Sequence, residues 1–368
     1  MVRVLFVFRV MNRGGAETVT MNIYRNIDKS KIQFDFLCMS NEKGDYEDEI
    51  NRLGGKIYRI SPPTKGRYIK HIKDIVKICK QNGPYKAIHA TTAFHSGFVC
   101  FAGYLVNIPI RVVHSHTAEM KNNGILRKMY NSFCRLLINV FATDKIACGK
   151  LAGEVLFGKN NKNILIINNG IDIDKYNEVK VEELKTIKKQ YNIGDDELLI
   201  GNVGRIVEVK NQKYFIKLAK QYKKKNQKVK FLIVGTGDLE KELKKQIEQE
   251  QLNNFFVFTG VREDIWNIMN LIDVLVMPSL YEGFPMVIIE ALAAGKNCVV
   301  SSTISKEVDI VPNSVAFVNL NDSEQEWINA INEKANQSVD RKLRKKILEE
   351  KGFSIKKTSK VFEEIYMR

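Results

Sequence analysis

The chain alternates short, β-branched apolar runs with longer amphipathic stretches, and this alternation constrains its fold more than any other feature. The runs have the length and continuous hydrophobicity of strands that are buried on both faces of a parallel sheet. They occupy 2–8, 34–39, 86–90, 110–115, 144–149 and 163–170 in the first half, and 198–204, 229–237, 255–260, 273–279 and 297–302 in the second. The pattern predicts an α/β fold with two doubly wound domains, whose ligands bind at the carboxyl ends of the strands.

The boundary between the two domains is expected in a polar segment over 171–195 that lacks a strand pattern. We therefore expect a Rossmann-like domain over 1–170 and a second one over 196–352, with 171–195 as a linker. A chain of 368 residues is long enough to build two hydrophobic cores.

Positive charge is concentrated in the first half of the chain. The net charge is +16, and residues 1–170 carry 26 Lys and Arg against 12 Asp and Glu, while residues 171–368 carry 32 against 30. Such an excess indicates an anionic partner for the first half: nucleic acid, an anionic membrane surface or a phosphorylated substrate. The alternative is that the basic composition only keeps the protein soluble.

Several classes of protein are disfavoured by composition. No apolar stretch approaches the roughly 20 residues that span a bilayer. The first residues are apolar but contain Arg3 and Arg9, so they are typical of a first strand and not of a signal peptide. Six cysteines without a CxxC pair indicate a reduced, cytoplasmic compartment with neither disulfides nor a cysteine metal site.

Two strand-end loops have the composition of anion sites. The first strand is followed by Gly14 and Gly15, which allow close backbone approach just before a helix whose free N–H groups favour an anion. In the second half, Arg205 and Lys210 follow the strand "LLIGNVG", and two cations at that point suit a diphosphate. Solvated surface charges are the alternative. The glycine loop "IVGTGDLE" (233–240) is weaker evidence by itself.

The stretch "LYEGFPMVIIEALAAG" (280–295) contains Glu282 in a turn and Glu290 within an apolar run. A helix beginning near Pro285 would have proline in its first turn and Gly295 as its stop. Its inward stripe would be Ile288, Ile289, Leu292 and Ala293. Glu290 would then be flanked by core residues, which is unusual for a carboxylate without a binding role.

These stretches together resemble the retaining glycosyltransferases of family 4, which have the GT-B fold of two Rossmann-like domains facing across a cleft. The resemblance covers nearly the whole chain and rests on motifs that arrive in the family's order. They are "GGAE", "VHSHT" (113–117), "ACGKLAGEVLFG" (147–158), "NNGID" (168–172), "GRIVEVKNQ" (204–212), "VGTGDLE", "GVREDI" (260–265) and "SLYEGFPMVIIEALAAG". The versions "GGAE" and "HSHT" are most similar to those of enzymes that assemble capsular and exopolysaccharide repeat units.

The resemblance implies roles for particular residues. Glu290 would accept hydrogen bonds from the ribose hydroxyls of a nucleotide sugar, with a UDP-sugar expected, and Glu282 would lie beside the sugar and its leaving phosphate. Arg205 and Lys210 would neutralise the diphosphate, and His116 would lie near the anomeric centre. The catalytic set is therefore His116, Glu282, Arg205 and Lys210, and the remaining donor-binding residues are Gly14, Gly15, Gly235, Val261, Arg262, Gly283, Phe284, Pro285, Met286 and Glu290.

The resemblance also implies that neither a metal nor a cofactor is needed, because two cations do the work of a metal ion. The Asp172-Ile-Asp174 segment imitates a metal site of a different glycosyltransferase fold, but it belongs to the interdomain segment. No carboxylate can be placed beneath the anomeric carbon, so a same-face route is favoured over a double displacement. His89 and His114 are expected to be structural or to face the acceptor. Pro285 stands where many relatives have glycine, which leaves the identity of the sugar open.

The first domain is expected to hold the acceptor, and 353–368 to form a helix that packs back on it, as in the family. Two basic amphipathic segments there, 66–81 and 124–141, suit either core packing or anionic lipid. A lipid-diphosphate-linked acceptor at the inner face of the cell membrane fits the charge asymmetry. The alternatives are a sugar-nucleotide epimerase of the same fold, a basic nucleic-acid-binding protein and a non-catalytic partner subunit.

Overall fold

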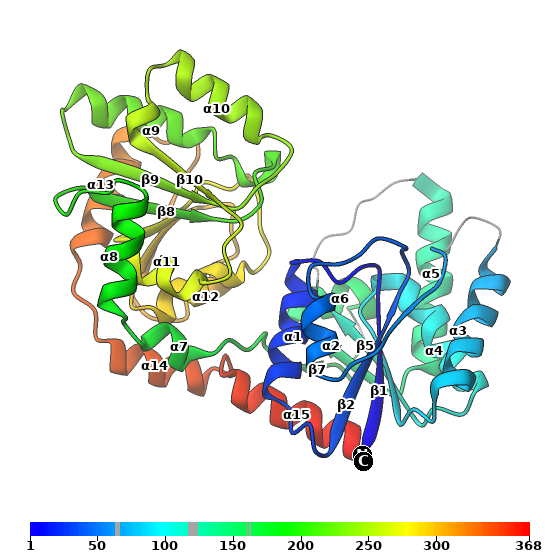
Figure 1. The fold of residues 1–368 in the computed structure, drawn as a ribbon. Helices are drawn as coiled ribbons and strands as arrows, with labels where there is room; N and C mark the ends of the chain where they lie inside the picture. Colours follow the sequence, from blue (N-terminus) through cyan, green and yellow to red (C-terminus); the bar gives the residue numbers. More distant parts are fainter. Residues whose placement is uncertain (63–66, 117–123, 160, 162) are drawn as a thin grey trace. The chain divides into compact units, whose positions relative to one another are not determined.

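The computed structural model describes residues 1–62, 67–116, 124–159, 161 and 163–368, which form two compact units (Figure 1). The first unit contains Met1–Ile171 and Gly352–Arg368, and the second contains Asp172–Lys351. Each is built around one parallel sheet, as the continuous apolar runs predict.

The first unit has a seven-stranded sheet in the order β3-β2-β1-β4-β5-β6-β7. Its strands are β1 Val2–Phe8, β2 Ile32–Cys38, β3 Ile57–Arg59, β4 Ala87–Ala90, β5 Ile110–Ser115, β6 Asp144–Ala147 and β7 Leu165–Ile166. Its helices are α1 Gly15–Asn26, α2 Glu47–Arg52, α3 Tyr68–Asn82, α4 Ser96–Leu105, α5 Gly124–Phe141, α6 Lys150–Phe157 and α15 Ile355–Met367, with a 3₁₀ turn η1 at Ala93–His95. β1 and β4 are neighbours in the middle of the sheet. Between them the order in which the chain adds strands reverses, as it does in a doubly wound sheet.

Alternate residues of β1 pack into different layers of this unit. Val4, Phe6 and Phe8 share a core with α1, α2 and α15, whereas Leu5 and Val7 share another with α3 and α4. The strand can be apolar at every position because helices cover both faces of the sheet.

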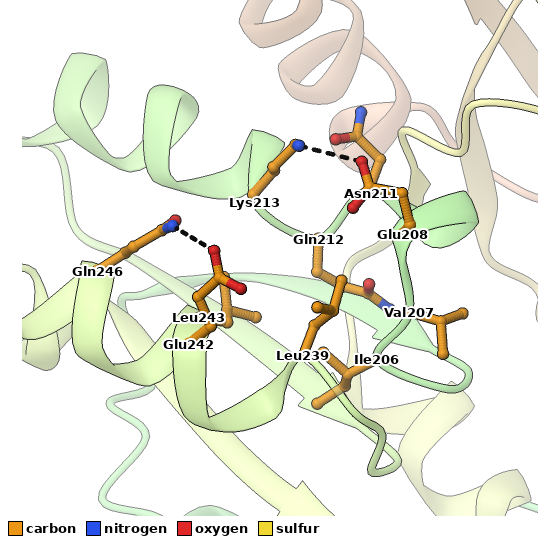
Figure 2. Close-up of a pocket in the computed structure, with 10 residues that line it drawn as sticks. All are labelled: Ile206, Val207, Glu208, Asn211, Gln212, Lys213, Leu239, Glu242, Leu243 and Gln246. Carbon is orange, nitrogen blue, oxygen red and sulfur yellow. Dashed lines mark hydrogen bonds and ion pairs between the residues drawn. The ribbon is translucent and has the colours of Figure 1, made fainter.

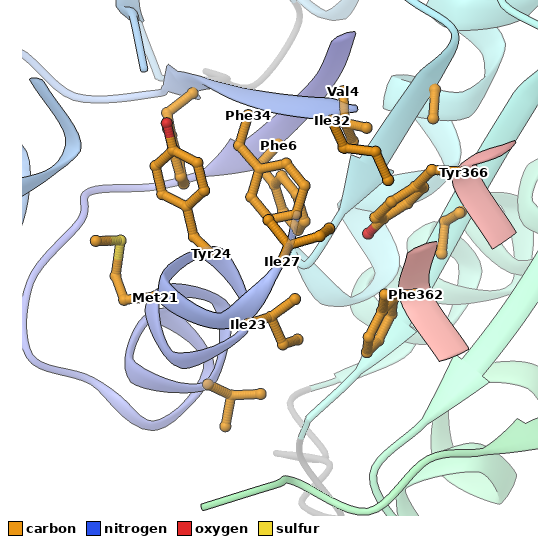
Figure 3. Packing of buried hydrophobic residues seen from close by; sticks show 14 of the residues in the cluster. Val4, Phe6, Met21, Ile23, Tyr24, Ile27, Ile32, Phe34, Phe362 and Tyr366 are labelled. Atoms are coloured by element: carbon orange, nitrogen blue, oxygen red, sulfur yellow. The ribbon is translucent and has the colours of Figure 1, made fainter. Parts of the chain in front are cut away.

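The final helix α15 returns to the first unit. Phe362, Ile365 and Tyr366 are buried in the same cluster as Phe6 and Phe34 (Figure 3). Backbone hydrogen bonds also hold the start of α15 beside Ile171. Ile171 N donates to Phe353 O at 2.8 Å, and Ile355 N donates to Ile171 O at 2.9 Å. Within the first unit, therefore, the last residues of the chain complete the core around β1.

The second unit has a six-stranded sheet in the order β10-β9-β8-β11-β12-β13. Its strands are β8 Leu198–Val203, β9 Val229–Val234, β10 Phe256–Gly260, β11 Val274–Met277, β12 Asn297–Ser301 and β13 Val315–Val318. Its helices are α7 Ile173–Asn177, α8 Val181–Gln190, α9 Tyr214–Lys224, α10 Glu240–Gln249, α11 Ile265–Leu271, α12 Met286–Ala293, α13 Glu324–Asn336 and α14 Arg341–Glu350, with 3₁₀ turns η2 Glu208–Lys210, η3 Asn253–Phe255 and η4 Lys306–Val308. α9 and α10 cover one face of the sheet, and α11 and α12 lie on the opposite face (Figure 1).

The segment 171–195, which the sequence suggests as a linker, contains α7 and α8, and these helices belong to the second unit. Asn270 of α11 holds α7 by donating from Nδ2 to Tyr176 O at 2.9 Å. Asn267 of the same helix donates to Glu183 Oε2 of α8 at 2.6 Å. The segment is polar because it lies on the surface of the unit, with Ile187 of α8 buried.

Two edge strands, β3 and β13, lie outside the predicted strands. Each is short and flanked by residues without a strand pattern, so hydrophobic periodicity does not predict either strand. In the described part of the chain, no helix combines the length and the apolarity needed to cross a bilayer.

Candidate active site

The carboxyl ends of β8, β9 and β10 meet in three glycine loops. Gly204 N donates to Val234 O at 2.9 Å, and Gly235 N donates to Gly260 O at 2.8 Å. Gly235 has a φ of +125°, and a Cβ there would clash with the carbonyl oxygen of Gly204. Gly235, which the resemblance assigns to donor binding, is thus required by the close approach of two strand ends.

Buried amides tie the end of β8 and the loop after it to the end of β11 and the segment that follows. Asn202 Nδ2 donates to Val276 O and Asn211 Nδ2 to Pro278 O, both at 2.9 Å. Leu280 N donates to Val209 O at 2.8 Å. Arg205 and Lys210 come from the first loop and Glu282 from the second, so these bonds bring the predicted residues to one edge of the sheet.

At this edge, Lys210 and Glu282 form an ion pair, with Nζ and Oε1 2.5 Å apart. Ser279 Oγ donates to the same carboxylate oxygen at 3.0 Å. Both charged side chains are largely shielded, with 20% and 15% of their surface exposed, whereas Arg205 is exposed. An anion that binds here would meet one open cation and one cation already oriented by a carboxylate.

Helix α12 begins and ends as the sequence predicts. Pro285 is its N-cap, and Gly295 follows its end with a φ of +75°. The predicted inward stripe is confirmed, because Ile288, Ile289, Leu292 and Ala293 are all at most 2% exposed.

Glu290 of α12 lies half-buried beside Tyr176 of α7. Burial raises the pKa of its carboxyl group to about 7, and a hydrogen bond from the Tyr176 hydroxyl lowers that pKa in part. The Tyr176 pKa is raised well above its usual value, first by burial and then by the Glu290 charge, so the phenol stays protonated and donates. A carboxylate in this position can accept hydrogen bonds from a ligand.

The other predicted residues of this unit lie around the same loops. Arg262 forms a double ion pair with Asp264, with nitrogen–oxygen distances of 2.8 and 2.6 Å, and also donates to the Tyr191 hydroxyl at 3.3 Å. Val261 is 58% exposed. The remaining four lie in the turn before α12 and at its first residue; Gly283, Phe284 and Met286 are half-buried, and Pro285 is buried.

A pocket adjoins the start of the loop after β8, between that loop and α10 (Figure 2). An ion pair between Lys213 and Glu208, at 3.2 Å, and a hydrogen bond between Gln246 and Glu242, at 3.1 Å, lie on its walls. The described residues that line it do not include the predicted ones, so the pocket and the predicted site are different places in the unit.

In the first unit, Gly14 is the N-cap of α1, and Gly15 is its first residue. A Cβ on Gly14 would meet the carboxylate of Glu17, whose pKa is raised by burial. A Cβ on Gly15 would meet nothing within 4 Å. Gly15 therefore has open space beside its backbone, which is what close approach of a ligand requires.

His116 follows β5, and its ring lies against the ring of His114, with centroids 3.9 Å apart and an interplanar angle of 38°. Burial lowers the His116 pKa to about 4, so the ring is neutral at pH 7. Neither of its ring nitrogens has a hydrogen-bond partner among the described residues, and Thr117 of the same motif lies outside them. His89 has a structural bond, since its Nδ1 lies 2.6 Å from the Tyr366 hydroxyl of α15.

The two aspartates that imitate a metal motif have local partners. Asp172 is the N-cap of α7 and accepts from Lys175 N at 3.3 Å, and Asp174 pairs with Lys345 of α14. Among the described residues, no group of three or more potential metal ligands is found.

Two family models match the chain. The model described as Glycosyltransferase Family 4 matches residues 13–175, and the model described as Glycosyl transferases group 1 matches residues 184–351. The putative glycosyltransferase EpsF of Bacillus subtilis is 38% identical over 336 residues, which cover 89% of this chain and 86% of that protein. The chain belongs to the family 4 glycosyltransferases.

Two further relatives match this glycosyltransferase over almost its full length. The capsular polysaccharide biosynthesis glycosyltransferase CapH of Staphylococcus aureus is 26% identical, with 100% of this chain and 99% of that protein covered. The UDP-Gal:alpha-D-GlcNAc-diphosphoundecaprenol alpha-1,3-galactosyltransferase of Escherichia coli is 27% identical, with coverage of 96% and 93%.

Among solved structures, HepE of Anabaena in complex with UDP is similar to this glycosyltransferase, with a TM-score of 0.79 at 20% identity and 99% of each chain covered. The similarity confirms the predicted GT-B fold with two Rossmann-like domains.

The predicted residues of this glycosyltransferase thus fall into two groups, one at the strand ends of each unit. Sequence reasoning missed Tyr176, Ser279 and Asn202, which hold Glu290, Glu282 and the loop after β8. Ser279 lies inside the quoted motif, three residues before its partner Glu282, so its contact could have been expected from the sequence. The partners of Tyr176 and Asn202 are distant in sequence, and only the fold brings them together.

Proposed function

We propose that this glycosyltransferase moves a sugar from a UDP-sugar to a lipid-diphosphate-linked acceptor, with retention of configuration, in capsular or exopolysaccharide synthesis. The observation that carries the donor half is the edge of the second sheet, where Arg205, Lys210 and Glu282 come from loops tied together by hydrogen bonds. Glu290 comes from α12, the helix that follows the second of these loops. The names of the relatives support the rest: HepE was crystallised with UDP, the Escherichia coli relative is named for a diphosphoundecaprenol acceptor, and CapH is named for capsular polysaccharide biosynthesis.

In the proposed reaction, the bond between the anomeric carbon and the diphosphate oxygen breaks as the acceptor oxygen bonds to the same face of that carbon. The acceptor's proton passes to the leaving phosphate oxygen. Charge grows on the diphosphate during this step, and Arg205 and Lys210 would stabilise it without a metal ion. Glu290 would fix the ribose, and neutral His116 would contact hydroxyls of the donor sugar as a hydrogen-bonding group.

The test is a donor screen with each UDP-sugar, purified lipid-diphosphate-linked acceptor and EDTA. We expect one sugar to be transferred, and NMR coupling constants should show that the product keeps the anomeric configuration of the donor. Inversion, or a requirement for a divalent cation, would contradict the mechanism. Isomerised UDP-sugar in the absence of acceptor would favour an epimerase instead.

We also propose that the enzyme works as a peripheral protein on the anionic cytoplasmic surface of the membrane, and the outer stripe of α5 supports this. The stripe consists of residues that are 52% to 83% exposed, namely Ile125, Leu126, Met129, Phe133, Leu136 and Val140. Arg127 and Lys128 lie beside it and are also exposed. Apolar side chains rimmed by cations suit an anionic lipid surface.

The second basic segment differs, because α3 buries its apolar face. Ile75 and Cys79 are buried in the core with α4, and Ile72 and Val76 pack against that core, whereas Ile69 is exposed. Gly66 of that segment lies outside the described residues. α3 therefore exposes lysines, whereas α5 exposes both cations and a stripe of apolar side chains.

Co-sedimentation of the full chain with vesicles tests this. Binding should require anionic lipid and fall as salt rises. Leu126→Gln with Phe133→Gln should weaken it strongly, while the control pair Val181→Gln with Leu343→Gln, which changes similarly exposed apolar residues of the second unit, should not. Equal loss in both pairs would contradict a membrane role for α5.

A further inference from the structure

We propose that Arg341 of α14 is a positioning residue for the donor site, because its guanidinium group caps the C-terminal end of α12 and ties that end to α11. α12 carries Glu290 and begins just after the turn that contains Glu282. The inference rests on the proposed function and deepens it. It concerns a residue outside the strand-end loops that determines where the ribose carboxylate lies.

The C-terminal end of α12 is closed partly by the chain itself and partly by Arg341. Lys296 N donates to Ala291 O at 2.8 Å across Gly295, whose φ is +75°. This is the bonding pattern of a Schellman motif, which provides donors for carbonyl groups in the last turn of a helix. Arg341 Nη2 donates to the next carbonyl along the chain, that of Ala294. The guanidinium group therefore completes the cap.

The same nitrogen atom of Arg341 also reaches a second helix. Arg341 Nη2 donates to Asn270 Oδ1 of α11 at 2.5 Å, and Asn270 Nδ2 donates to Tyr176 O of α7 at 2.9 Å. Hydrogen bonds from a charged donor are stronger than those between neutral groups. One guanidinium group and one amide therefore join α14, α12, α11 and α7 at a single point.

The place of Arg341 in its own helix indicates that the cation serves α12. Arg341 is the first residue of α14, which follows the N-cap Asp340 and has no acidic residue in its first turn. The N-terminal end of a helix carries partial positive charge, and the C-terminal end carries partial negative charge. A cation at this position is therefore unfavourable for α14 and favourable for α12.

The capped carbonyl lies one helical turn from the proposed ribose ligand. Ala294 N donates to Glu290 O at 3.0 Å, so these two residues lie on the same face of α12. At the other end, the N-cap Pro285 has no side-chain group that could hold the helix. Because α12 is fixed at its C-terminal end, loss of the Arg341 bonds should let the helix shift and move Glu290 out of the geometry that binding requires.

Arg341→Gln tests the inference, with Arg344→Gln as the matched control. Arg344 lies on the same helix, is 5% exposed, and donates to Lys296 O at 2.8 Å and to Asn297 Oδ1, beyond the end of α12. Both variants remove a shielded cation from α14, so both should lower the free energy of unfolding. Calorimetry measures UDP affinity at a temperature where both variants are folded.

We expect Arg341→Gln to bind UDP about tenfold more weakly than the unmodified enzyme, and the control to stay within about twofold of it. The KM for the donor should rise accordingly, while kcat changes little, because the ribose contact is uniform through the reaction. Unchanged UDP affinity in Arg341→Gln would overturn the inference, and so would an equal loss in the control, which a general loosening of the unit predicts.

A double-mutant cycle with Glu290→Gln provides a readout that a merely structural role would not change. If Arg341 acts through Glu290, the two losses of UDP affinity are not additive. Arg341→Gln should then weaken UDP binding much less in the Glu290→Gln background than in the unmodified enzyme. The same fold-change in both backgrounds would contradict a positioning role.

The single variants separate this inference from the proposed function. If Glu290→Gln binds UDP as well as the unmodified enzyme does, the proposed donor site is wrong, and the inference fails with it. If Glu290→Gln binds UDP weakly while Arg341→Gln binds it normally, the donor site is supported and the positioning role alone is wrong.

Discussion

The polar side chains at the carboxyl ends of the strands differ between the two units in whether they have hydrogen-bond or ion-pair partners. In the second unit, Glu282 has Lys210 and Ser279 as partners, and Glu290 has Tyr176. In the first unit, His116 has no hydrogen-bond partner for either ring nitrogen among the described residues, and one nitrogen of His114 is in the same position. A buried polar group without a partner is costly, so such groups are commonly reserved for a ligand.

This difference indicates that the two units have different roles in the reaction. The second unit orients its charged groups with its own side chains, as electrostatic stabilisation of a diphosphate requires. The first unit keeps neutral histidines at its strand ends and carries the excess of positive charge over its surface. We therefore expect substitutions in the second unit to lower the rate of the reaction, and low pH to reduce the stability of the first unit.

The largest effect is expected from Lys210→Met. The variant removes a cation that the account places on the departing diphosphate, so turnover should fall about 10²- to 10³-fold while UDP affinity falls much less. Single-turnover rates and calorimetry measure the two quantities. Lys213→Met is the control, since Lys213 lies nearby but forms an exposed ion pair with Glu208, and its rate should stay close to that of the unmodified enzyme. A similar fall in turnover in both variants would contradict the role assigned to Lys210.

A smaller effect is expected on stability from Gly235→Ala. The new methyl group would clash with the Gly204 carbonyl at a φ that alanine rarely adopts, so the free energy of unfolding should fall by about 1–3 kcal/mol. Gly15→Ala has open space and should change it by less than about 0.5 kcal/mol. Denaturant unfolding measures both. A destabilised Gly15→Ala would show that the first glycine loop is as closely packed as the second.

Acid should destabilise the first unit more than the second. All five histidines, at positions 71, 89, 95, 114 and 116, lie in the first unit, and burial lowers the pKa of each. Their contribution is present above pH 6.5, the value in the unfolded chain, and is lost as the pH falls toward the folded values, which are about 4 for His95 and His116.

For His116 alone, the loss at pH 5 should be about 2 kcal/mol relative to pH 7.5. Hydrogen exchange at the two pH values, read separately for peptides of each sheet, measures it, and His116→Gln should reduce the pH dependence in the first unit. Equal acid sensitivity of the two sheets would contradict the comparison.

Sequence reasoning predicts the parts of the fold that depend on periodicity. The central strands are continuous apolar runs, and the inward stripe of α12 follows from its spacing, so both could be derived residue by residue. The short edge strands β3 and β13 are stabilised by neighbours and not by their own pattern. The helices α7 and α8 are polar on their exposed surfaces and resemble a linker for that reason.

Contacts between distant segments are the part that sequence does not determine. Helices α3 and α5 have the same basic amphipathic pattern, but α4 covers the apolar face of α3 while the outer stripe of α5 stays exposed. In the same way, Glu290 can be chosen as a binding carboxylate from its apolar setting, whereas its partner Tyr176 depends on how α7 packs.

The central claim is that Glu290 binds the ribose of a UDP-sugar, and the direct measurement is the UDP affinity of Glu290→Gln by calorimetry at pH 8. The glutamine keeps the size of the side chain but replaces a carboxylate with an amide that can accept on one side only. We predict a loss of about 1.5–3 kcal/mol in binding free energy, with a smaller further effect on the single-turnover rate, because the ribose changes little during the reaction. UDP affinity equal to that of the unmodified enzyme would contradict the placement of Glu290 at the ribose.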